Sequence, residues 1–165
     1  MKIIYLFKSI IASIKLTIHT GNPFIFFRCS VICKGKLIIR GSLSGFRNAH
    51  LQIEPNGVLI LNKNLHVSEN INIRCCRLID INKNCRFAPN TIISDTTYRN
   101  LGSENPEIIE GKIKIGSNCF VGAFTIICGN VIVKDGAIIG SHMIIKNKEI
   151  KEGSLYTLST YKNDN

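Results

Sequence analysis

The sequence has few acidic side chains. It contains 11 Asp and Glu against 21 Lys and Arg in 165 residues, a formal net charge of +10. Such a surplus indicates an anionic partner: a nucleic acid, a membrane surface or a phosphorylated ligand. No run of basic residues is interleaved with aromatic residues, and we therefore expect no nucleic-acid partner. Charged residues make up only 19% and hydrophobic residues 45%, which predicts one folded domain with a sizeable core.

The sequence also lacks an apolar run long enough to cross a membrane. The N-terminal stretch "MKIIYLFKSIIASIKLTI" is interrupted by Lys8 and Lys15 and falls short of the ~20 apolar residues that a span needs. It has no small-residue cleavage site, which argues against a signal peptide. Its apolar residues share one helical face, which predicts an amphipathic helix over residues 1–20. We expect this helix to cap the domain; the alternative is a peripheral contact with an anionic membrane.

No cysteine pattern typical of a metal site is present. Cys29 and Cys33 have no second pair at zinc-finger spacing, and the adjacent Cys75 and Cys76 are poor co-ligands. We interpret most of the seven cysteines as small core residues of a reduced, cytoplasmic protein. We predict no metal site, and the four scattered histidines offer no set of three ligands.

Aliphatic residues recur every six positions, a period that neither a helix nor a simple strand makes. The six successive hits are Ile115, Val121, Ile127, Val133, Ile139 and Ile145. A second set precedes each hit by two residues: Ile113, Cys119, Thr125, Val131, Ala137 and Met143. Because strand side chains alternate, the two sets point the same way and are expected to face a core.

The same period extends toward the N-terminus with two interruptions. One group of pairs begins at Leu59 and the next at Ile79, offset by two extra residues around Cys76 and Arg77. Leu37/Ile39 and Leu51/Ile53 are interpreted as a first, irregular coil. Repeats of this kind predict a solenoid whose coils have three six-residue sides. No helical segments separate the strands, which excludes a doubly wound α/β fold.

At this point the sequence resembles the bacterial hexapeptide-repeat acyltransferases, the O-acetyltransferases of sugars and polysaccharides in particular. The stretch "IGSNCFVGAFTIICGNVIVKDGAIIGSHMII" is similar to the family's C-terminal coils, and the resemblance covers residues 37–155. It implies an all-β, left-handed parallel β-helix, a homotrimer, and acetyl-CoA bound between neighbouring subunits. The predicted organisation is a helix over 1–20, a β-helix over 21–155 and a tail over 156–165.

The residue between each inward pair must point away from the core. In the last two coils these residues are mostly apolar: Lys114, Phe120, Ile126, Ile132, Ile138 and Ile144. A monomer rarely exposes such a surface. Cover by a terminal segment is one explanation; we favour a subunit interface, which agrees with the resemblance.

A loop of about residues 94–111 interrupts the ladder, and insertions are where such folds carry binding chemistry. In the family it resembles, this loop carries an Asp-x-x-aromatic-His motif whose His accepts the acceptor's proton. Asp95 and Tyr98 match the motif, but Arg99 stands where the His is expected. Arginine stays protonated and cannot act as a base, so Arg99 would only orient substrate or stabilise an oxyanion. The base is left open among Asp95 and four histidines: His19, His50, His66 and His142.

The resemblance also places coenzyme A against the last coils. Backbone amides at Gly122, Ala123, Gly140 and Ser141 would border the cofactor, and Lys146 would meet its phosphates. The alternatives are that these small residues only make corners and that the lysine is solvated. The sequence therefore predicts an acetyl-CoA-dependent O-acetyltransferase acting on a sugar or surface-polysaccharide precursor. The alternative, which Arg99 favours, is a catalytically inactive trimeric binding or scaffold protein.

Overall fold

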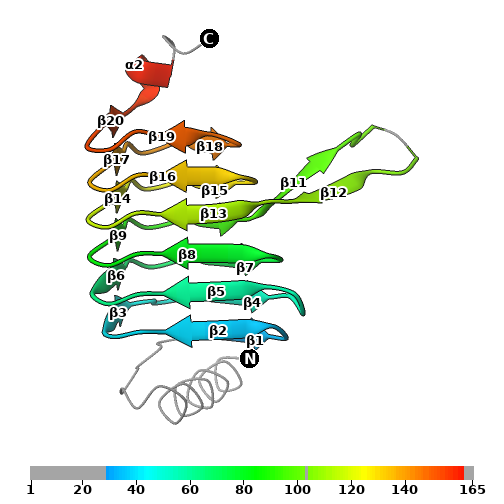
Figure 1. The fold of residues 1–165 in the computed structure, drawn as a ribbon, viewed down its shortest axis with the longest axis horizontal. Coiled ribbons are helices and arrows are strands. Elements are labelled where there is room, and N and C mark those ends of the chain that lie inside the picture. Colours follow the sequence, from blue (N-terminus) through cyan, green and yellow to red (C-terminus); the bar gives the residue numbers. More distant parts are fainter. Residues whose placement is uncertain (1–28, 103, 162–165) are drawn as a thin grey trace.

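The computed structural model describes residues 29–102 and 104–161, which form a parallel β-solenoid of six turns (Figure 1). Each turn contributes one strand to each of three six-stranded sheets. Sheet A contains β1 (Ser30–Cys33), β4 (His50–Ile53), β7 (Asn72–Cys75), β10 (Ile92–Ser94), β15 (Ile126–Cys128) and β18 (Ile144–Lys146).

Sheets B and C complete the triangle. Sheet B contains β2 (Lys36–Ile39), β5 (Val58–Leu61), β8 (Leu78–Ile81), β13 (Lys112–Ile115), β16 (Val131–Val133) and β19 (Glu149–Ile150). Sheet C contains β3 (Leu43–Gly45), β6 (Leu65–Val67), β9 (Arg86–Phe87), β14 (Phe120–Val121), β17 (Ile138–Ile139) and β20 (Leu155–Tyr156). A hairpin of β11 (Thr96–Arg99) and β12 (Glu107–Glu110) projects from the solenoid, and a short helix, α2 (Leu158–Tyr161), follows the last turn.

The predicted ladder forms the core. All the inward-facing side chains predicted from Leu59 to Ile145 are at most 2% exposed. Leu51 and Ile53 of the first coil are fully buried, whereas Leu37 at its edge is only partly buried. Thr125 takes an inward position without an unsatisfied hydroxyl, because its Oγ1 donates to the carbonyl of Gly140 at 2.9 Å. The six-residue period therefore identified the core residues from Leu59 to Ile145.

The turns differ in length. Ile126 pairs with Ile144, 18 positions on, as three six-residue sides require. Earlier turns are longer: His50 pairs with Asn72, 22 positions on, and Asn72 pairs with Ile92, 20 positions on. The extra residues lie at corners and leave the inward ladder unbroken. The first coil, interpreted as irregular, is in parallel register with the rest, since Leu37 pairs with Leu59 and Leu51 with Ile73.

Asparagines make two of the corner columns. At the corner between sheets B and C, Asn64, Asn84 and Asn118 all have φ near +58° to +60°, the left-handed region that Asn tolerates better than most residues. Their amides form a ladder along the solenoid axis: Asn64 donates to Asn84 at 3.1 Å, and Asn84 donates to Asn118 at 3.0 Å. Asn48, Asn70 and Asn90 form a similar ladder at the corner between sheets C and A.

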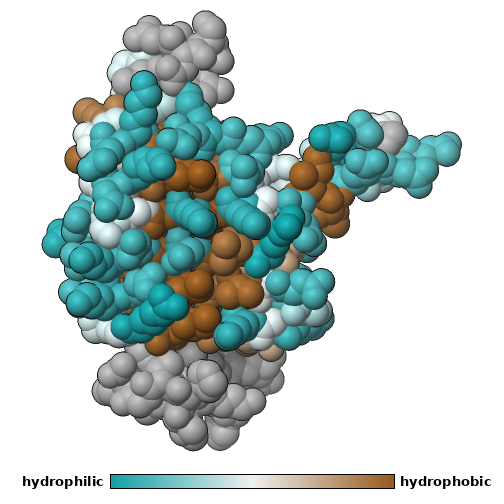
Figure 2. Space-filling view, in the orientation of Figure 1, coloured by the Kyte–Doolittle hydropathy of each residue, from teal (hydrophilic) through white to brown (hydrophobic). Residues whose placement is uncertain are grey.

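The outward apolar residues do not form one surface, contrary to the sequence-based interpretation. Because each coil has three sides, the six predicted residues divide between three faces: Lys114 and Ile132 on sheet B, Phe120 and Ile138 on sheet C, Ile126 and Ile144 on sheet A. Figure 2 shows apolar side chains along the middle of the sheet B face. On sheets A and C, the exposed apolar residues are Ile32 in the first turn and, in the fourth to sixth turns, Ile92, Phe120, Ile138, Ile144 and Leu155.

The N-terminal helix predicted over residues 1–20 lies outside the described residues. In the part of the chain that is described, no helix is both long and apolar enough to span a bilayer. All seven cysteines are described and none forms a disulfide; five are buried, Cys128 is half-buried and Cys33 is exposed.

Replacing Asn84 tests the corner ladder. We expect Asn84→Ala to lower the free energy of unfolding by about 1–2 kcal/mol, because it removes two side-chain amide hydrogen bonds and places alanine at a positive φ. Asn84→Gly removes the same bonds but accepts that φ, and should lose less. Urea unfolding measures both, and an N84A protein as stable as the wild type would contradict the ladder's role.

Candidate functional site

The insertion forms an antiparallel hairpin that leaves the solenoid at the corner between sheets A and B (Figure 1). Ile92 pairs with Ile126, 34 positions on, where the following turn needs only 18. The coils above and below the insertion remain in register, since β10 pairs with β7 on one side and β15 on the other. The hairpin is therefore an addition to an intact solenoid.

Asp95 fixes the base of this hairpin. Its side chain is fully buried, and its carboxylate accepts three backbone hydrogen bonds. Oδ1 accepts from the amide of Cys76 at 2.7 Å, while Oδ2 accepts from the amides of Arg77 at 2.7 Å and Leu78 at 2.8 Å. The amides of Cys76 and Arg77 belong to the two-residue enlargement of the preceding coil, and the amide of Leu78 begins β8 directly after it. A buried carboxylate needs such compensation, since burying an unpaired charge is costly.

This geometry favours an anchoring role for Asp95 over that of a general base. Its oxygens are directed at amides of its own chain, and the side chain has no exposed surface from which to meet an acceptor hydroxyl. The neighbouring Cys75 thiol lies 3.8 Å from Oδ2. Burial raises the pKa of Cys75 to about 12, with the carboxylate charge acting in the same direction, so this thiol stays protonated.

Tyr98 and Arg99 lie further out on β11. Tyr98 is 46% exposed and its hydroxyl hydrogen bonds to Arg74 on sheet A. Partial burial by itself lowers the pKa of Arg74, but the bond to Tyr98 and the nearby acidic groups outweigh it and raise that pKa. Arg99 is exposed and pairs across the hairpin with Glu107. Its exposed guanidinium can therefore meet an anion, but Arg99 itself cannot act as a base.

The predicted cofactor-binding residues meet at a different corner, between sheets C and A. Gly122 and Ala123 make this corner in one turn, and Gly140 and Ser141 make it in the next. A Cβ on Gly122 would lie 2.5 Å from the carbonyl carbon of Gly140 and the nitrogen of Ser141. Coil stacking thus already requires glycine at 122. Gly140 is less crowded, because a Cβ there would lie 3.4 Å from its nearest neighbours.

An aromatic pair continues this corner. The rings of Phe124 and His142 stack with centroids 5.1 Å apart, and both residues have φ near +60°. Phe124 is 54% exposed, so the corner presents small residues beside an exposed aromatic face. Such a surface is suited to a ligand with an extended, partly apolar arm.

Lys146 lies away from that corner. It is exposed on β18, opposite Cys128, at the side of sheet A that faces the hairpin. Lys148 follows at the next corner, where its Nζ donates to the hydroxyl of Tyr156 at 2.9 Å. The structure thus brings Gly122, Ala123, Gly140 and Ser141 together, but separates them from Lys146, Asp95, Tyr98 and Arg99 by the width of sheet A, roughly 15–20 Å.

Sequence reasoning missed the amide nest that holds Asp95. The signal was present, because the two extra residues at Cys76 and Arg77 fall at the corner from which the hairpin leaves one turn later. Among the described residues, no group of three or more His, Cys, Asp or Glu side chains is arranged to hold a metal ion.

Removing the Asp95 carboxylate should destabilise the hairpin base. We expect Asp95→Ala to lower the free energy of unfolding by about 3 kcal/mol, because three amides lose their acceptor in a buried site. Glu110→Ala, at an exposed hairpin position, is the control and should change stability by less than about 0.5 kcal/mol. Hydrogen exchange at Cys76, Arg77 and Leu78 localises the effect, and unchanged protection in D95A would refute the anchor.

Comparison with known proteins identifies the repeat and the fold. Residues 112–147 match the profile of the bacterial transferase hexapeptide (six repeats). A solved structure of an AntD variant, an N-acyltransferase from Bacillus cereus in complex with dTDP and coenzyme A, has a TM-score of 0.61 at 15% identity, covering 81% of this chain and 80% of that chain. A second AntD variant in complex with the same two molecules has a TM-score of 0.53 at 14% identity, covering 82% and 86%. No curated protein matches by sequence. Residues 112–147 therefore carry the hexapeptide repeat, and the chain shares its fold with this N-acyltransferase.

Proposed function

We propose that the protein is an acyltransferase that transfers an acetyl group from acetyl-CoA to a hydroxyl of a sugar or surface-polysaccharide precursor. The hexapeptide match and the fold shared with a coenzyme A-bound acyltransferase support this proposal. The proposal includes a left-handed winding of the solenoid and a cytoplasmic location, where acetyl-CoA is supplied.

The observation that carries the proposal is the corner between sheets C and A where Gly122, Ala123, Gly140 and Ser141 leave the backbone uncovered by large side chains, called the bare corner below. Ala123 and Ser141 occupy equivalent positions in successive turns, and the side chains beside them are the exposed Phe124 and His142. The hairpin of the same chain leaves from a different corner and does not cover this one (Figure 1). A pantetheine arm laid along the corner could hydrogen bond to backbone and contact the Phe124 ring.

Transfer requires three functions besides cofactor binding. A base must take the proton of the acceptor hydroxyl, positive charge or N–H groups must stabilise the tetrahedral oxyanion, and the thiolate must leave. Arg99 supplies a fixed positive charge and suits the second function. Asp95 holds the hairpin that carries Tyr98 and Arg99, so we assign it to positioning.

We further propose that the working unit is a homotrimer. Within one chain, Arg99 and the bare corner are separated by sheet A, so a site containing both needs a second copy. Exposed apolar residues flank that corner on both sides, with Phe120 and Ile138 on sheet C and Ile144 on sheet A. The hairpin also carries exposed apolar side chains, Tyr98 and Ile108, which are direct cross-strand partners. A neighbour's hairpin placed against the corner would bury both surfaces.

Coenzyme A binding tests the proposed function directly. At 100 times its dissociation constant, the cofactor should add about 2.7 kcal/mol to the free energy of unfolding, a readily measured thermal shift. Ser141→Phe should reduce the shift by filling the corner, whereas Glu152→Phe, exposed at another corner, should retain it. Absence of any shift at millimolar coenzyme A would overturn the proposal. A shift without transfer to any sugar or amino sugar would instead support the binding or scaffold alternative.

Two lysines in the apolar corner surface should prevent trimer formation. We expect Ile138→Lys combined with Ile144→Lys to give a folded monomer, because the interface would bury two unpaired charges. Ile32→Lys, at a similarly exposed position in the first turn, is the control and should leave assembly unchanged. Light scattering measures the mass in solution, and a monomeric wild-type protein would contradict the proposed assembly.

A further inference from the structure

The face of sheet C changes character along the solenoid axis. In the C-terminal turns its outward column is apolar, with Phe120 on β14 and Ile138 on β17. In the N-terminal turns the same column is polar: Ser44 on β3, His66 on β6 and Arg86 on β9 are direct neighbours in register. None of the residues placed in the cofactor corner or the hairpin belongs to this polar part.

Ser44 holds the imidazole of His66. The Ser44 hydroxyl lies 3.0 Å from Nδ1 of His66 and 3.4 Å from the carbonyl oxygen of Leu65. A hydroxyl has one proton, which Ser44 can donate either to Nδ1 or to the Leu65 carbonyl, and the tautomer of His66 follows from which of the two accepts it. When Ser44 donates to Leu65, its oxygen accepts from Nδ1–H of His66, and the proton of the neutral ring is on Nδ1. Nε2 then carries the lone pair, and it makes no hydrogen bond to the described residues. This is the tautomer that a general base needs.

His66 lies between two shallow hollows. One, of ≈ 300 Å³, extends toward the corner between sheets C and A and is lined by Arg47, Ser68 and Glu69. The other, of ≈ 280 Å³, extends toward the corner between sheets B and C and is lined by Ser42, Asn64 and Arg86. His66 is the residue that both hollows share. A ligand lying across the face would therefore contact the imidazole at its middle.

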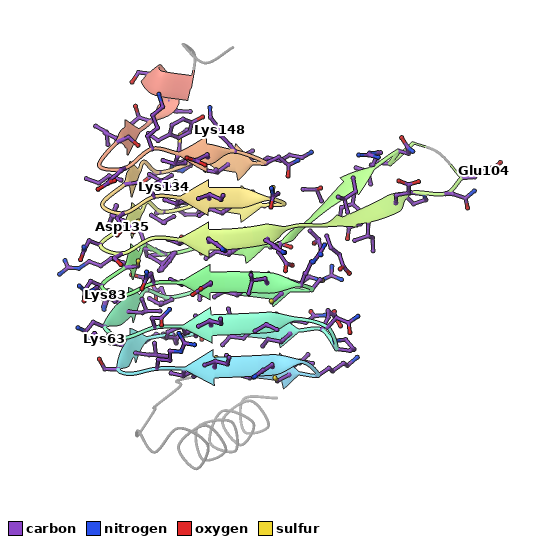
Figure 3. The ribbon with its side chains drawn as sticks, in the orientation of Figure 1. Lys63, Lys83, Glu104, Lys134, Asp135 and Lys148 are labelled. Carbon is purple, nitrogen blue, oxygen red and sulfur yellow. The ribbon has the colours of Figure 1, made fainter. Side chains whose placement is uncertain are left out.

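The charge around these hollows is mainly positive. Arg47 and Arg86 line them, and Glu69 is the one acidic residue in their lining. Lys63 and Lys83 project from successive turns at the adjoining corner, where Lys134 and Asp135 also lie (Figure 3). Two guanidinium groups with nearby ammonium groups favour a phosphate-bearing ligand, because guanidinium binds phosphate bidentately and ammonium contributes charge. The +10 net charge of the chain is consistent with this ligand class.

We propose that this polar part of sheet C binds a phosphorylated acceptor, and that His66 is the general base which Arg99 cannot be. The inference rests on the proposed transferase function. Arg86 and Arg47 bind the acceptor's phosphate. Nε2 of His66 takes the proton of the acceptor hydroxyl while the hydroxyl oxygen attacks the thioester carbonyl. The C–O bond forms, the C–S bond breaks, and the imidazolium returns its proton to the departing thiolate. His66 is thus a catalytic residue, and Ser44 is a positioning residue that sets its tautomer.

The phosphate-binding part is tested without turnover. Inorganic pyrophosphate, compared with sodium chloride at the same ionic strength, should raise the melting temperature of the wild-type protein. Arg86→Gln should lose most of that shift, whereas Lys114→Gln, which removes one positive charge from the face of sheet B, should retain it. Equal shifts in the two variants, or none in the wild type, would overturn the phosphate site.

The base is tested by transfer from acetyl-CoA to hexoses and hexose 1-phosphates. We expect His66→Gln to lower kcat by ~10²- to 10⁴-fold, and the control His50→Gln to leave it unchanged. Ser44→Ala should lower kcat with little change in KM, and Ser44→Thr should restore it by restoring the hydroxyl. Because Ser44 and His66 are exposed, we expect these variants to fold, and a melting temperature equal to that of the wild type confirms it.

The outcomes separate the two proposals. If coenzyme A binds and the wild type transfers acetyl groups, but H66Q keeps the wild-type rate, the assignment of the base is wrong and the transferase function stands. If coenzyme A does not bind, the transferase function fails, while the pyrophosphate comparison still decides whether sheet C binds phosphate.

Discussion

The structure depends on backbone hydrogen bonds that run from coil to coil. In the three sheets, strands of successive turns pair in parallel, so that a side chain in one turn lies directly over its equivalent in the next. Whether a side chain is buried depends on whether it points inward within its own coil. Which side chains become neighbours depends on how the coils are stacked. Anything added at a corner is tolerated as long as the inward ladder keeps its register, and the hairpin and the enlarged early turns both follow this rule.

The same stacking turns sequence position into chemistry. Equivalent corner residues form columns, so Asn64, Asn84 and Asn118 satisfy one another's amides, and Phe124 stacks on His142. Outward residues form columns as well, which brings Ser44, His66 and Arg86 together although they are about twenty residues apart in sequence. A hexapeptide-repeat protein can therefore assemble a polar site on a flat face without any loop, provided that successive turns contribute the right residues.

The period of six was sufficient to predict the core, because it records burial directly, and Thr125 kept its place in that pattern despite its hydroxyl. The sequence was less informative where turn length varies. The first coil departs from 18 residues, so its register with later turns was not recognised, and the adjacency of Ser44 to His66 was missed. The division of the outward residues between three faces follows from the same triangular coil. Asp95 was recognised through a resemblance that concerns chemistry, whereas its three amide contacts are a property of the fold that no motif records.

These observations separate two demands that one loop is expected to meet together. The hairpin must be held rigidly, and Asp95 does so with a carboxylate that is consequently unavailable as a base. Arg99 brings permanent positive charge, which suits oxyanion stabilisation but would compete with proton abstraction at the same position. Since Asp95 and Arg99 leave the hairpin without a base, the base has to come from a separate element. A histidine fixed by a serine on a flat sheet, beside arginines that hold an anionic acceptor, satisfies that requirement, and the stacked coils supply all of these groups at neighbouring positions.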